Sequence, residues 1–239
     1  MKKLVIIPTY NERENILPMI DKVFSLPEPF DLLIIDDGSP DGTADMVKFR
    51  QQDWPGRLYI LQREGKLGLG TAYITGFKWA IEHGYDYVFE MDADFSHNPD
   101  DLIRLYEAAT LGADVVVGSR YVTGVNVVNW PIGRLLMSYY ASVYVRLMTG
   151  MPVHDATAGF MCYSNKALKT IDLDAVRMKG YGFQVEMKYT VWKLGFNVKE
   201  VSIVFTERVL GASKMSSGIF GEAFWGVMKL RFRSIKPRQ

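Results

Sequence analysis

The sequence predicts an α/β fold of three layers, in which helices cover both faces of a mostly parallel central sheet. Short apolar runs alternate with segments of helical spacing over the first 120 residues, which is the pattern of repeated strand–helix units. Several of these runs end in acidic or glycine-containing loops, as expected at the ligand-binding edge of such a sheet. The chain has 239 residues, 48% of them hydrophobic, which is enough for one substantial core. We therefore expect a single domain over 1–239.

Five apolar runs in the first half are predicted to be strands, because they are rich in β-branched and aromatic side chains. They cover 4–8, 32–35, 58–61, 87–91 and 114–118. Helical segments are expected between them, at about 11–26, after Gly70 and at 99–111. The last of these follows Asn98 and Pro99, two residues that favour a helix start.

The second half predicts two amphipathic helices, over 131–149 and 219–233. Between them we expect a glycine-containing turn at 154–164, a helix at 183–194 and a strand at 198–205. The adjacent Tyr139 and Tyr140 indicate either core packing or contact with a membrane interface. The apolar stripe of the last helix ends in Lys229, Arg231 and Arg233. Because this pattern is typical of a helix lying on anionic lipid, we expect peripheral contact with a membrane.

Asp92 and Asp94 stand one residue apart at the end of the run 87–91. Two carboxylates at a buried strand end repel each other, and a hard cation such as Mg²⁺ or Mn²⁺ relieves this repulsion by binding their oxygens. A cation held there would in turn bind a diphosphate. A strand end followed by a helix cap explains the same residues without a metal, and the D-x-D pattern alone does not decide between the two interpretations.

Composition and missing motifs exclude several functional classes. The 28 Lys and Arg residues balance 27 Asp and Glu residues, which argues against a nucleic-acid-binding protein and an acidic disordered chain. The sequence has no P-loop motif and no glycine-rich dinucleotide fingerprint after its first strand. A lone Cys162 suits the reducing cytosol. No uncharged apolar stretch approaches the length of a membrane span, so we expect a cytoplasmic protein on the cytoplasmic face of a membrane.

Seven motifs carry a family resemblance. They are PTYNE (8–12), DDGSPDGT (36–43), GLGTAY (68–73), MDADFSHNP (91–99), GSRY (118–121), DATAGF (155–160) and RVLGASKM (208–215). Together, over about residues 3–233, they resemble glycosyltransferase family 2 with its GT-A fold. More narrowly, they resemble the polyprenol (dolichol) phosphate mannosyltransferases of soluble length, without C-terminal membrane spans.

The resemblance implies an activity and assigns donor binding and acceptor binding to different parts of the chain. The implied enzyme is a dolichyl-phosphate β-D-mannosyltransferase, which moves mannose from GDP-mannose to a polyprenyl phosphate with inversion and with Mg²⁺ or Mn²⁺. Residues 1–122 would form the nucleotide-binding half, and 123–239 would form the acceptor half with its interface helices.

The resemblance also implies site residues, position by position. The guanosine would be held by Pro8, Tyr10, Glu12, Ile35 and Asp37. The sugar diphosphate would be held by Asp92, Ala93, Gln184, Arg208 and Lys214. The metal ligands would be Asp92, Asp94 and Ser96, the last at a position where the family often has Gln. The acceptor phosphate would meet Arg120, Arg134 and Ser138, and the catalytic group would be Asp94, Arg120, Arg134 and Asp155.

The implied chemistry agrees with the residue types. A phosphate acceptor is already ionised near pH 7, so the transfer needs positioning and charge compensation more than a general base. Arg120 and Arg134 are suited to hold a phosphate through paired N–H groups. Arg134 and Ser138 lie one turn apart on the helix predicted at 131–149, so one phosphate can meet both.

Several alternatives stay open. Arg120 can instead pair with an acidic residue at the sheet edge, and Asp155 can cap a helix. Glu186 would face either the sugar or solvent, and His154 would be a sugar contact or an accessory base. For the whole chain, the alternatives are a family 2 transferase with UDP-glucose, UDP-GlcNAc or another acceptor, and a non-catalytic nucleotide-sugar-binding module. The two basic, apolar helices of the second half favour a lipid acceptor.

Overall fold

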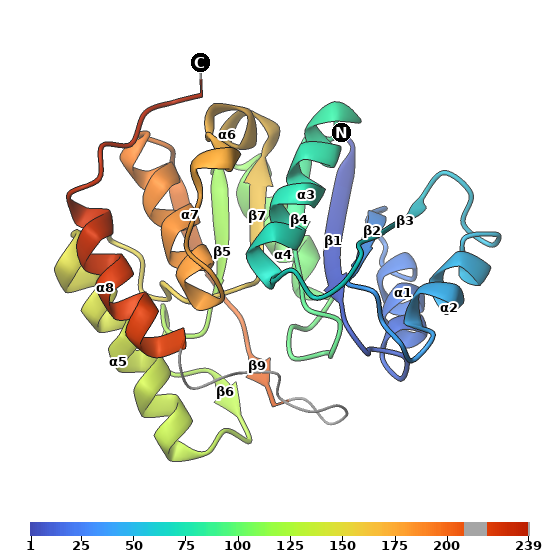
Figure 1. The fold of residues 1–239 in the computed structure, drawn as a ribbon, viewed down its shortest axis with the longest axis horizontal. Coiled ribbons are helices and arrows are strands. Elements are labelled where there is room, and N and C mark those ends of the chain that lie inside the picture. The colour runs from blue at the N-terminus through green and yellow to red at the C-terminus, as the bar shows by residue number, and fades with distance from the viewer. Residues whose placement is uncertain (208–218, 239) are drawn as a thin grey trace.

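A seven-stranded sheet forms the centre of the molecule, in the order β3-β2-β1-β4-β7-β5-β8 (Figure 1). Its strands are β1 (Lys3–Thr9), β2 (Asp31–Asp36), β3 (Leu58–Gln62), β4 (Tyr87–Glu90), β5 (Val115–Ser119), β7 (Met161–Ser164) and β8 (Val198–Ser202). Neighbouring strands are parallel except at β7, which is antiparallel to both β4 and β5. The mostly parallel sheet is therefore confirmed. This computed structural model describes residues 1–207 and 219–238, with the side chains of the last helix described from residue 224 onward.

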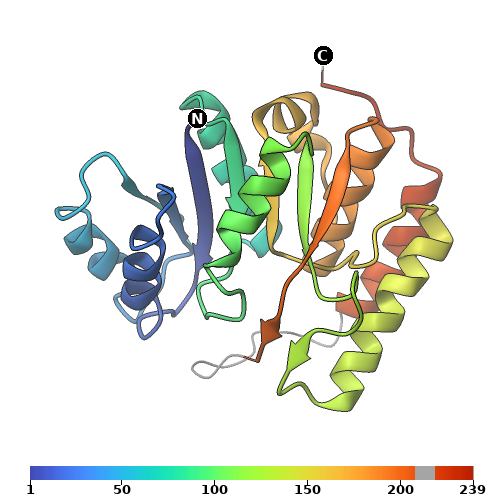
Figure 2. The ribbon, with the colours of Figure 1, turned by 180° about the vertical axis from the view of Figure 1, so that it is seen from behind.

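Two helical layers enclose the sheet (Figures 1 and 2). One face is covered by α3 (Leu69–Glu82), α6 (Asn165–Thr170) and α7 (Tyr181–Lys193), with a 3-10 turn at Leu173–Ala175 between the last two. The other face is covered by α1 (Ile16–Phe24), α2 (Thr43–Arg50) and α4 (Asp101–Thr110). Leu4 and Ile6 of β1 join the first core, whereas Val5 and Ile7 join the second. Burial on both faces explains the unbroken apolar run of this strand.

Helix α3 packs closely on β1 and β2 because Gly76 has no side chain. A Cβ atom at this position would lie 2.7 Å from Ile6 Cδ1 and 3.0 Å from Ile35 Cδ1. A larger residue would therefore push the helix away from the sheet. Arg63 links the first turn of α3 to the end of β2, because its guanidinium donates to the Thr71 hydroxyl at 2.8 Å and to Asp37 Oδ1 at 2.6 Å.

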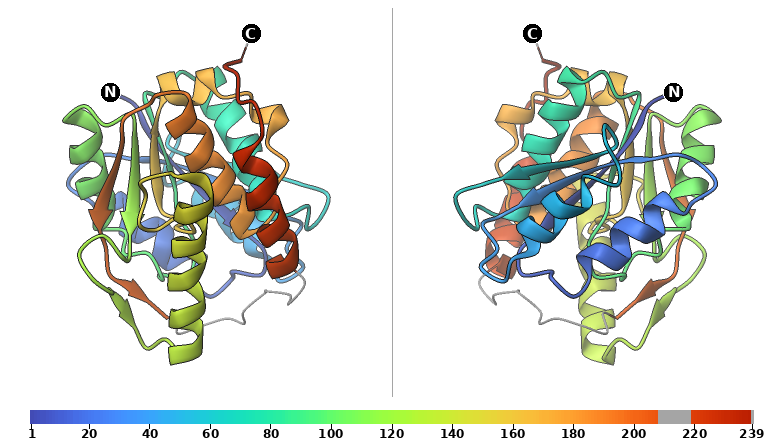
Figure 3. Two further views of the ribbon diagram at one scale, coloured as in Figure 1. Left: turned by 90° about the vertical axis from the view of Figure 1, so that its left-hand side faces the viewer. Right: turned by 90° about the vertical axis from the view of Figure 1, so that its right-hand side faces the viewer.

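Helices α5 (Ile132–Thr149) and α8 (Ile219–Arg231) lie side by side outside α7 (Figures 1 and 3). The Tyr144 ring stacks on Phe224 at 4.7 Å, and the Tyr144 hydroxyl donates to Phe224 O at 3.0 Å. The side chains of α5 that are buried are Ser142, Val145 and Thr149. Tyr139 and Tyr140 are 40% and 62% exposed, so core packing is the wrong alternative for this pair. Within 1–207 and 219–238, no helix is long and apolar enough to cross a membrane.

Strand β7 is the main departure from the sequence prediction. The predicted turn at 154–164 contains this four-residue strand, which separates β4 from β5. Met161, Cys162 and Tyr163 are all fully buried. A run this short, with both faces covered, has no polar alternation by which a strand is recognised in a sequence.

Other elements also differ from the prediction, and helix α6 and strand β6 (Val127–Val128) have no predicted counterpart. The strand expected at 198–205 is wrong in its second part, because β8 ends at Ser202. Beyond it, β9 (Phe205–Thr206) pairs in parallel with β6 in a separate two-stranded ladder. Helix α2 was not predicted, since its residues TADMVKFR show little apolar periodicity and follow the turn-forming glycines of 36–43.

Candidate active site

The loop that carries Asp92 and Asp94 begins where β4 ends, and hydrogen bonds give it a defined shape. Asp94 is 9% exposed, and its Oδ1 accepts hydrogen bonds from the backbone N–H (3.1 Å) and the hydroxyl (2.6 Å) of Ser96. Phe95, between them, has a φ of 60°, a left-handed conformation that is strained for a bulky residue. The side chain of Asp92 is 40% exposed. The loop therefore presents one sheltered and one accessible carboxylate.

Tyr10 and Asp37, two of the residues that the family resemblance assigns to the guanosine, lie at the ends of β1 and β2. Asp36 is fully buried, and its Oδ1 accepts a hydrogen bond from the Thr9 hydroxyl at 3.0 Å. The neighbouring Asp37 forms an ion pair with Arg63 at 2.5 Å. Lys66 Nζ lies 5.3 Å from the centre of the Tyr10 ring. An aromatic ring, a cation and carboxylates at the carboxyl ends of neighbouring strands suit a polar heterocyclic base.

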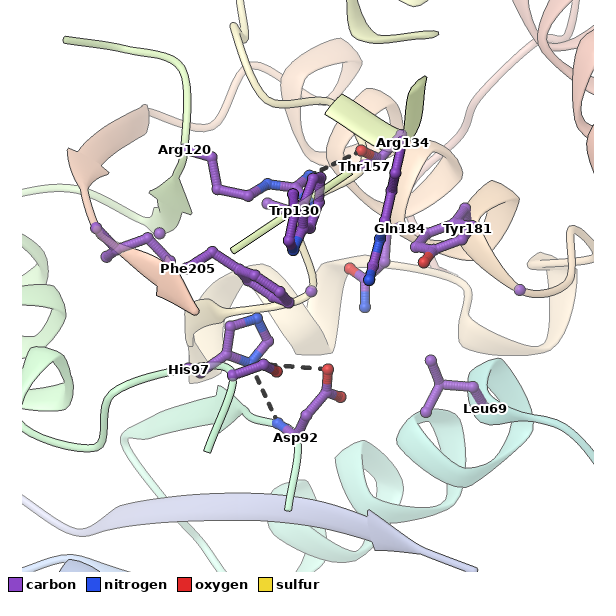
Figure 4. Close-up of a pocket in the computed structure, with 16 residues that line it drawn as sticks. Leu69, Asp92, His97, Arg120, Trp130, Arg134, Thr157, Tyr181, Gln184 and Phe205 are labelled. Atoms are coloured by element: carbon purple, nitrogen blue, oxygen red, sulfur yellow. Dashed lines mark hydrogen bonds and ion pairs between the residues drawn. The ribbon is translucent and has the colours of Figure 1, made fainter. Parts of the chain in front are cut away.

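A pocket at the carboxyl ends of β4 and β5 is lined from both halves of the chain (Figure 4). Its walls include Asp92, Ser96, His97, Arg120, Trp130, Arg134, Thr157, Gly159, Tyr181, Gln184 and Phe205. Five of these residues belong to the predicted site, namely Asp92, Ser96, Arg120, Arg134 and Gln184. Residues assigned to the donor and residues assigned to the acceptor therefore meet in one pocket.

Arg120 lies on one wall of this pocket and forms a buried ion pair with Asp155, which does not line the pocket. The Arg120 Nε and Nη2 atoms donate to the two carboxylate oxygens at 2.7 and 2.6 Å, and Nη2 also donates to the Thr157 hydroxyl at 2.9 Å. Burial opposes the charge on Asp155, but the adjacent guanidinium outweighs it and lowers the pKa of this carboxyl below its usual value. The Nη1 atom of Arg120 makes no hydrogen bond to any described residue. The alternative in which Arg120 pairs with an acidic residue is thus observed, and the two N–H bonds of Nη1 remain for a ligand.

Arg134 and Ser138, at the start of α5, are both already in contact with other side chains. Arg134 forms an ion pair with Glu207, and its guanidinium lies 4.2 Å from the centre of the Trp130 ring. The Ser138 hydroxyl accepts a hydrogen bond from the Tyr121 hydroxyl at 2.8 Å, which leaves its own proton to donate. Ser138 is not among the residues that line the pocket. An anion that binds Arg134 must therefore share it with Glu207 or displace Glu207.

His97 is a pocket residue that the sequence prediction missed, although it belongs to the motif MDADFSHNP. Its Nδ1 accepts a hydrogen bond from the Asp92 backbone N–H at 3.3 Å, and its ring stacks on Phe160 at 5.0 Å. Burial lowers the pKa of His97, which keeps the imidazole neutral. Because Nδ1 accepts a hydrogen bond, the proton of the neutral ring is on Nε2. His97 thus supports the loop that carries Asp92 and Asp94.

A second polar group lies beneath the pocket, in Glu90 of β4 and in Gln184 and Lys188 of α7. Gln184 Nε2 donates to Glu90 Oε2 at 2.6 Å, and Lys188 Nζ donates to Ala158 O at 2.6 Å. Burial raises the pKa of Glu90 and lowers the pKa of Lys188, because each ionised group is removed from water. Glu90 and Lys188 were not predicted, since a single charged residue within an apolar segment gives no indication of its partner.

Other residues singled out from the sequence lie outside the pocket wall. His154 Nδ1 contacts Glu200 Oε2 at 2.7 Å on the surface. Glu186 faces neither a sugar site nor solvent, because it is buried, pairs with Arg233 and accepts hydrogen bonds from the backbone of residues 177 and 178. Asp155 binds Arg120 and does not cap a helix.

The remaining predicted donor residues lie at the end of β1, at the end of β2 or in the loop of Asp92 and Asp94, or they lie outside the described residues. Pro8, Tyr10 and Glu12 are partly exposed at the end of β1, and Ala93 is buried between the two aspartates. Ile35 has no exposed surface, so any contribution to nucleoside binding would be indirect. Arg208 and Lys214 lie outside the described residues. Trp130 and Phe205, which stack edge to face at 5.2 Å, are further pocket residues that the sequence prediction missed.

The residues present fit a hard divalent cation that completes its ligand shell from a substrate. Across the described ranges, there is no cluster of three or more His, Cys, Asp or Glu side chains with metal-binding geometry. Asp92 and Asp94 supply two carboxylates, which are the ligands that Mg²⁺ and Mn²⁺ prefer. Mg²⁺ sites commonly take their other ligands from water and from substrate phosphates. Ser96 as a third ligand stays a prediction.

Comparison with known proteins gives close relatives over the full chain. The model of the family described as "Glycosyl transferase family 2" matches residues 4–172. The chain is 46% identical to an undecaprenyl-phosphate mannosyltransferase of Micrococcus luteus, over 100% of this chain and 99% of that protein. It is also 46% identical to a polyprenol monophosphomannose synthase of Mycolicibacterium smegmatis, over 95% of this chain and 87% of that protein.

Solved structures of lower sequence identity share the fold. Glucosyl-3-phosphoglycerate synthase of Mycobacterium tuberculosis, in complex with Mn²⁺, UDP and glucosyl-3-phosphoglycerate, superposes with a TM-score of 0.66 at 18% identity. The match covers 96% of this chain and 78% of that one. The same enzyme with Mg²⁺ and UDP gives a TM-score of 0.65, also at 18% identity, over 96% of this chain and 77% of that one.

Proposed function

Since the chain belongs to glycosyltransferase family 2, we propose that it transfers mannose from GDP-mannose to a polyprenyl phosphate, with inversion at the anomeric carbon. One observation carries the proposal: Asp92, from the loop after β4 (the acidic loop), Arg120, at the end of β5, and Arg134, from α5, line the same pocket. A diphosphate bound beside the acidic loop and a lipid phosphate bound beside the arginines would then be neighbours. The names of the two 46% identical relatives support mannose and a polyprenyl phosphate as the reactants.

Different residues of the predicted site would bind the donor and the acceptor. Asp92 and Asp94 would hold Mg²⁺ or Mn²⁺, which when bound would neutralise charge on the departing diphosphate. Tyr10 and Asp37 would face the guanine base. Arg120, through its Nη1, and Arg134 would hold the acceptor phosphate and orient its oxygen toward the sugar.

The transfer requires no general base. An oxygen of the lipid phosphate attacks C1 of mannose, and the bond from C1 to the diphosphate oxygen breaks, so that GDP leaves with the electron pair. The attacking phosphate is already ionised near pH 7, so no proton has to be removed from it. Attack on the side opposite the departing GDP inverts the anomeric centre.

A comparison of acceptors tests this proposal. The purified protein is incubated with GDP-mannose, Mg²⁺ and either a short polyprenyl phosphate or the matching polyprenol, and the lipids are analysed by mass spectrometry. We expect one hexose to be added to the phosphate and none to the alcohol. Addition to the alcohol alone would contradict a phosphate-binding role for the two arginines.

Replacement of Arg134 by Ala should weaken use of the acceptor and leave donor binding nearly unchanged. Arg134 is partly exposed and shares its charge with Glu207, so we expect kcat/KM for polyprenyl phosphate to fall by about 10- to 100-fold, or roughly 1.4 to 2.8 kcal/mol. Steady-state kinetics with the lipid phosphate measures use of the acceptor, and calorimetry of GDP-mannose binding measures affinity for the donor.

Arg104→Ala is the matched control, because Arg104 is an exposed arginine that also pairs with an acidic residue, Asp101, but lies on α4. It should leave both measurements unchanged. If Arg134→Ala instead loses affinity for GDP-mannose and keeps its acceptor KM, Arg134 belongs to the donor site.

We also propose that α5 and α8 contact a membrane that holds the lipid acceptor. Exposed apolar side chains gather on this pair of helices, namely Ile132, Leu136, Met137, Tyr139, Tyr140, Leu147, Phe224 and Trp225. A large exposed apolar surface on an otherwise packed protein is typical of an interaction site. The basic end of α8 is less available than its sequence suggests, because Arg233 pairs with Glu186 and Arg231 Nη1 donates to Met148 O at 2.6 Å.

Removal of two of these aromatic side chains should therefore weaken membrane binding. We expect the double variant Tyr140→Ser and Trp225→Ser to bind anionic vesicles at least about 10-fold more weakly, since each aromatic ring contributes apolar area to the interface. Vesicle sedimentation at low salt measures this. Phe49→Ser is the control, because Phe49 is 71% exposed on α2, and it should have no effect. Equal binding by the double variant and the wild-type chain would contradict the membrane contact.

A further inference from the structure

The polar group beneath the pocket is unusual because charged side chains take the place of an apolar core. Glu90 and Lys188 are fully buried, and Gln184 is 2% exposed. Lys188 Nζ donates to Ala158 O and, at 3.3 Å, to the backbone oxygen of Gln184. Burial of a carboxylate and an ammonium group costs stability, which an apolar replacement would avoid. A residue kept in such a place despite that cost is a candidate for a functional role.

Glu90 determines which end of the Gln184 amide faces the pocket. Gln184 Nε2 donates to Glu90 Oε2 at 2.6 Å, and an oxygen of the Glu90 carboxyl group can accept this hydrogen bond whether the group is neutral or ionised, so the nitrogen of the amide is engaged by Glu90. The other end of the amide, Oε1, is buried and has no hydrogen-bond partner in the described part of the chain. Gln184 lines the pocket with Asp92, and its amide points into the space between the pocket side chains (Figure 4). The pocket therefore contains a fixed acceptor that lacks a donor.

The chemistry of this acceptor selects its partner. An amide oxygen accepts hydrogen bonds only, so it repels phosphate oxygens and attracts hydroxyl groups. The N–H donors of the pocket, on Arg120 and Arg134, suit the phosphates of the two substrates. The transferred sugar carries hydroxyl groups and must lie between those phosphates. A sugar hydroxyl group is thus the hydrogen-bond donor that suits Gln184 Oε1.

We infer that Gln184 Oε1 accepts a hydrogen bond from one hydroxyl group of the transferred sugar, and that Glu90 is the positioning residue that fixes this orientation. The inference rests on the proposed function, because it takes a nucleotide sugar as the donor. It adds a determinant of sugar specificity: a site that hydrogen-bonds one hydroxyl group rejects the analogue that lacks it far more strongly than an apolar wall would.

Donor analogues that each lack one hydroxyl group test the inference. The kcat/KM values of GDP-mannose and of its 2-, 3-, 4- and 6-deoxy analogues are measured for the wild-type chain and for Gln184→Leu. We expect one analogue to lose about 10- to 100-fold with the wild-type chain and less than about 3-fold with Gln184→Leu. Exposed Gln52→Leu is the matched control and should keep the wild-type pattern.

Variants of Glu90 test its positioning role. Glu90→Leu removes the partner of Gln184 Nε2 and should abolish discrimination against the same analogue. Glu90→Gln keeps a side-chain oxygen that can accept from Nε2, so it should restore much of the discrimination. The dissociation constant of GDP alone, by calorimetry, should stay within about 2-fold in every variant, and melting temperatures identify any variant that fails to fold.

The outcomes separate the inference from the proposed function. If the wild-type chain uses GDP-mannose but every analogue loses the same factor with and without Gln184, the inference is overturned, which is the result expected if only a buried water contacts Oε1. If the wild-type chain does not use GDP-mannose, the proposed function fails. The same measurements are then made with the deoxy analogues of the nucleotide sugar that the wild-type chain does use. The comparison between the wild-type chain and Gln184→Leu then decides whether Gln184 contacts a sugar hydroxyl group.

Discussion

Asp94→Asn should abolish mannosyl transfer while the protein stays folded. Asp94 Oδ1 accepts two hydrogen bonds from Ser96, and an asparagine oxygen can accept both, so the shape of the loop is kept. The negative charge is lost, and with it much of the attraction for a divalent cation. We expect kcat to fall on the order of 10³-fold, or about 4 kcal/mol of transition-state stabilisation. Transfer assays in Mg²⁺ and in Mn²⁺, beside calorimetry of Mn²⁺ binding with GDP present, measure both effects.

The control for this experiment is Asp45→Asn, which removes the charge of an aspartate that is 84% exposed on α2. It should leave transfer and metal binding unchanged. A folded Asp94→Asn protein with full activity in either metal would contradict the metal role of this carboxylate.

Arg120→Met should destabilise the fold strongly, because it leaves the carboxylate of Asp155 buried without its partner. Asp155 has no exposed surface, and the side chain of Arg120 is 7% exposed. Breaking a buried ion pair by removal of one partner costs about 3 to 5 kcal/mol of unfolding free energy. Urea unfolding at pH 7, followed by circular dichroism, measures the loss. Arg50→Met is the matched control, since its ion pairs with Asp21 and Asp53 are exposed, and it should cost less than about 1 kcal/mol.

The pH dependence separates lost charge pairing from lost packing. In the wild-type chain the pKa of Asp155 is lowered, so its contribution to stability is present above the unfolded pKa and is lost as pH falls through the folded value. In Arg120→Met, burial without the guanidinium would raise this pKa instead, and stability would fall as pH rises above the unfolded value. The difference between the two proteins should therefore be larger at pH 7 than near pH 4. A difference that is equal at both values would indicate packing alone.

The sequence predicts well where Asp92 and Asp94 lie in the fold, because their position depends on local order. Asp92 and Asp94 follow an apolar run, and the structure has them directly after a buried strand of a mostly parallel sheet. The family resemblance and the GT-A fold that the motifs imply are confirmed by the full-length relatives and by the solved structures. These inferences need only the order of elements and the position of polar residues at strand ends.

Contacts between distant segments are the part that the sequence does not predict. Arg120 and Asp155 meet because β7, hidden in a predicted turn, enters the sheet between β4 and β5. Trp130 and Phe205 meet because β6 pairs with β9, and two-residue strands have no pattern of their own. Glu90 and Gln184 join a strand to a helix, and neither residue indicates its partner. The apolar stripe of α5 is visible in the sequence, but its exposure depends on which side packs against α8.

The central claim is that this chain uses GDP-mannose to glycosylate a lipid phosphate, and one comparison of donors tests it most directly. The purified protein is supplied with a short polyprenyl phosphate, Mg²⁺ and, in separate reactions, GDP-mannose, UDP-glucose or UDP-GlcNAc, and the rate at which sugar-linked lipid appears is measured by mass spectrometry. We predict product from GDP-mannose at a rate at least about 100-fold above either UDP-sugar. Product from a UDP-sugar, with none from GDP-mannose, would contradict the claim.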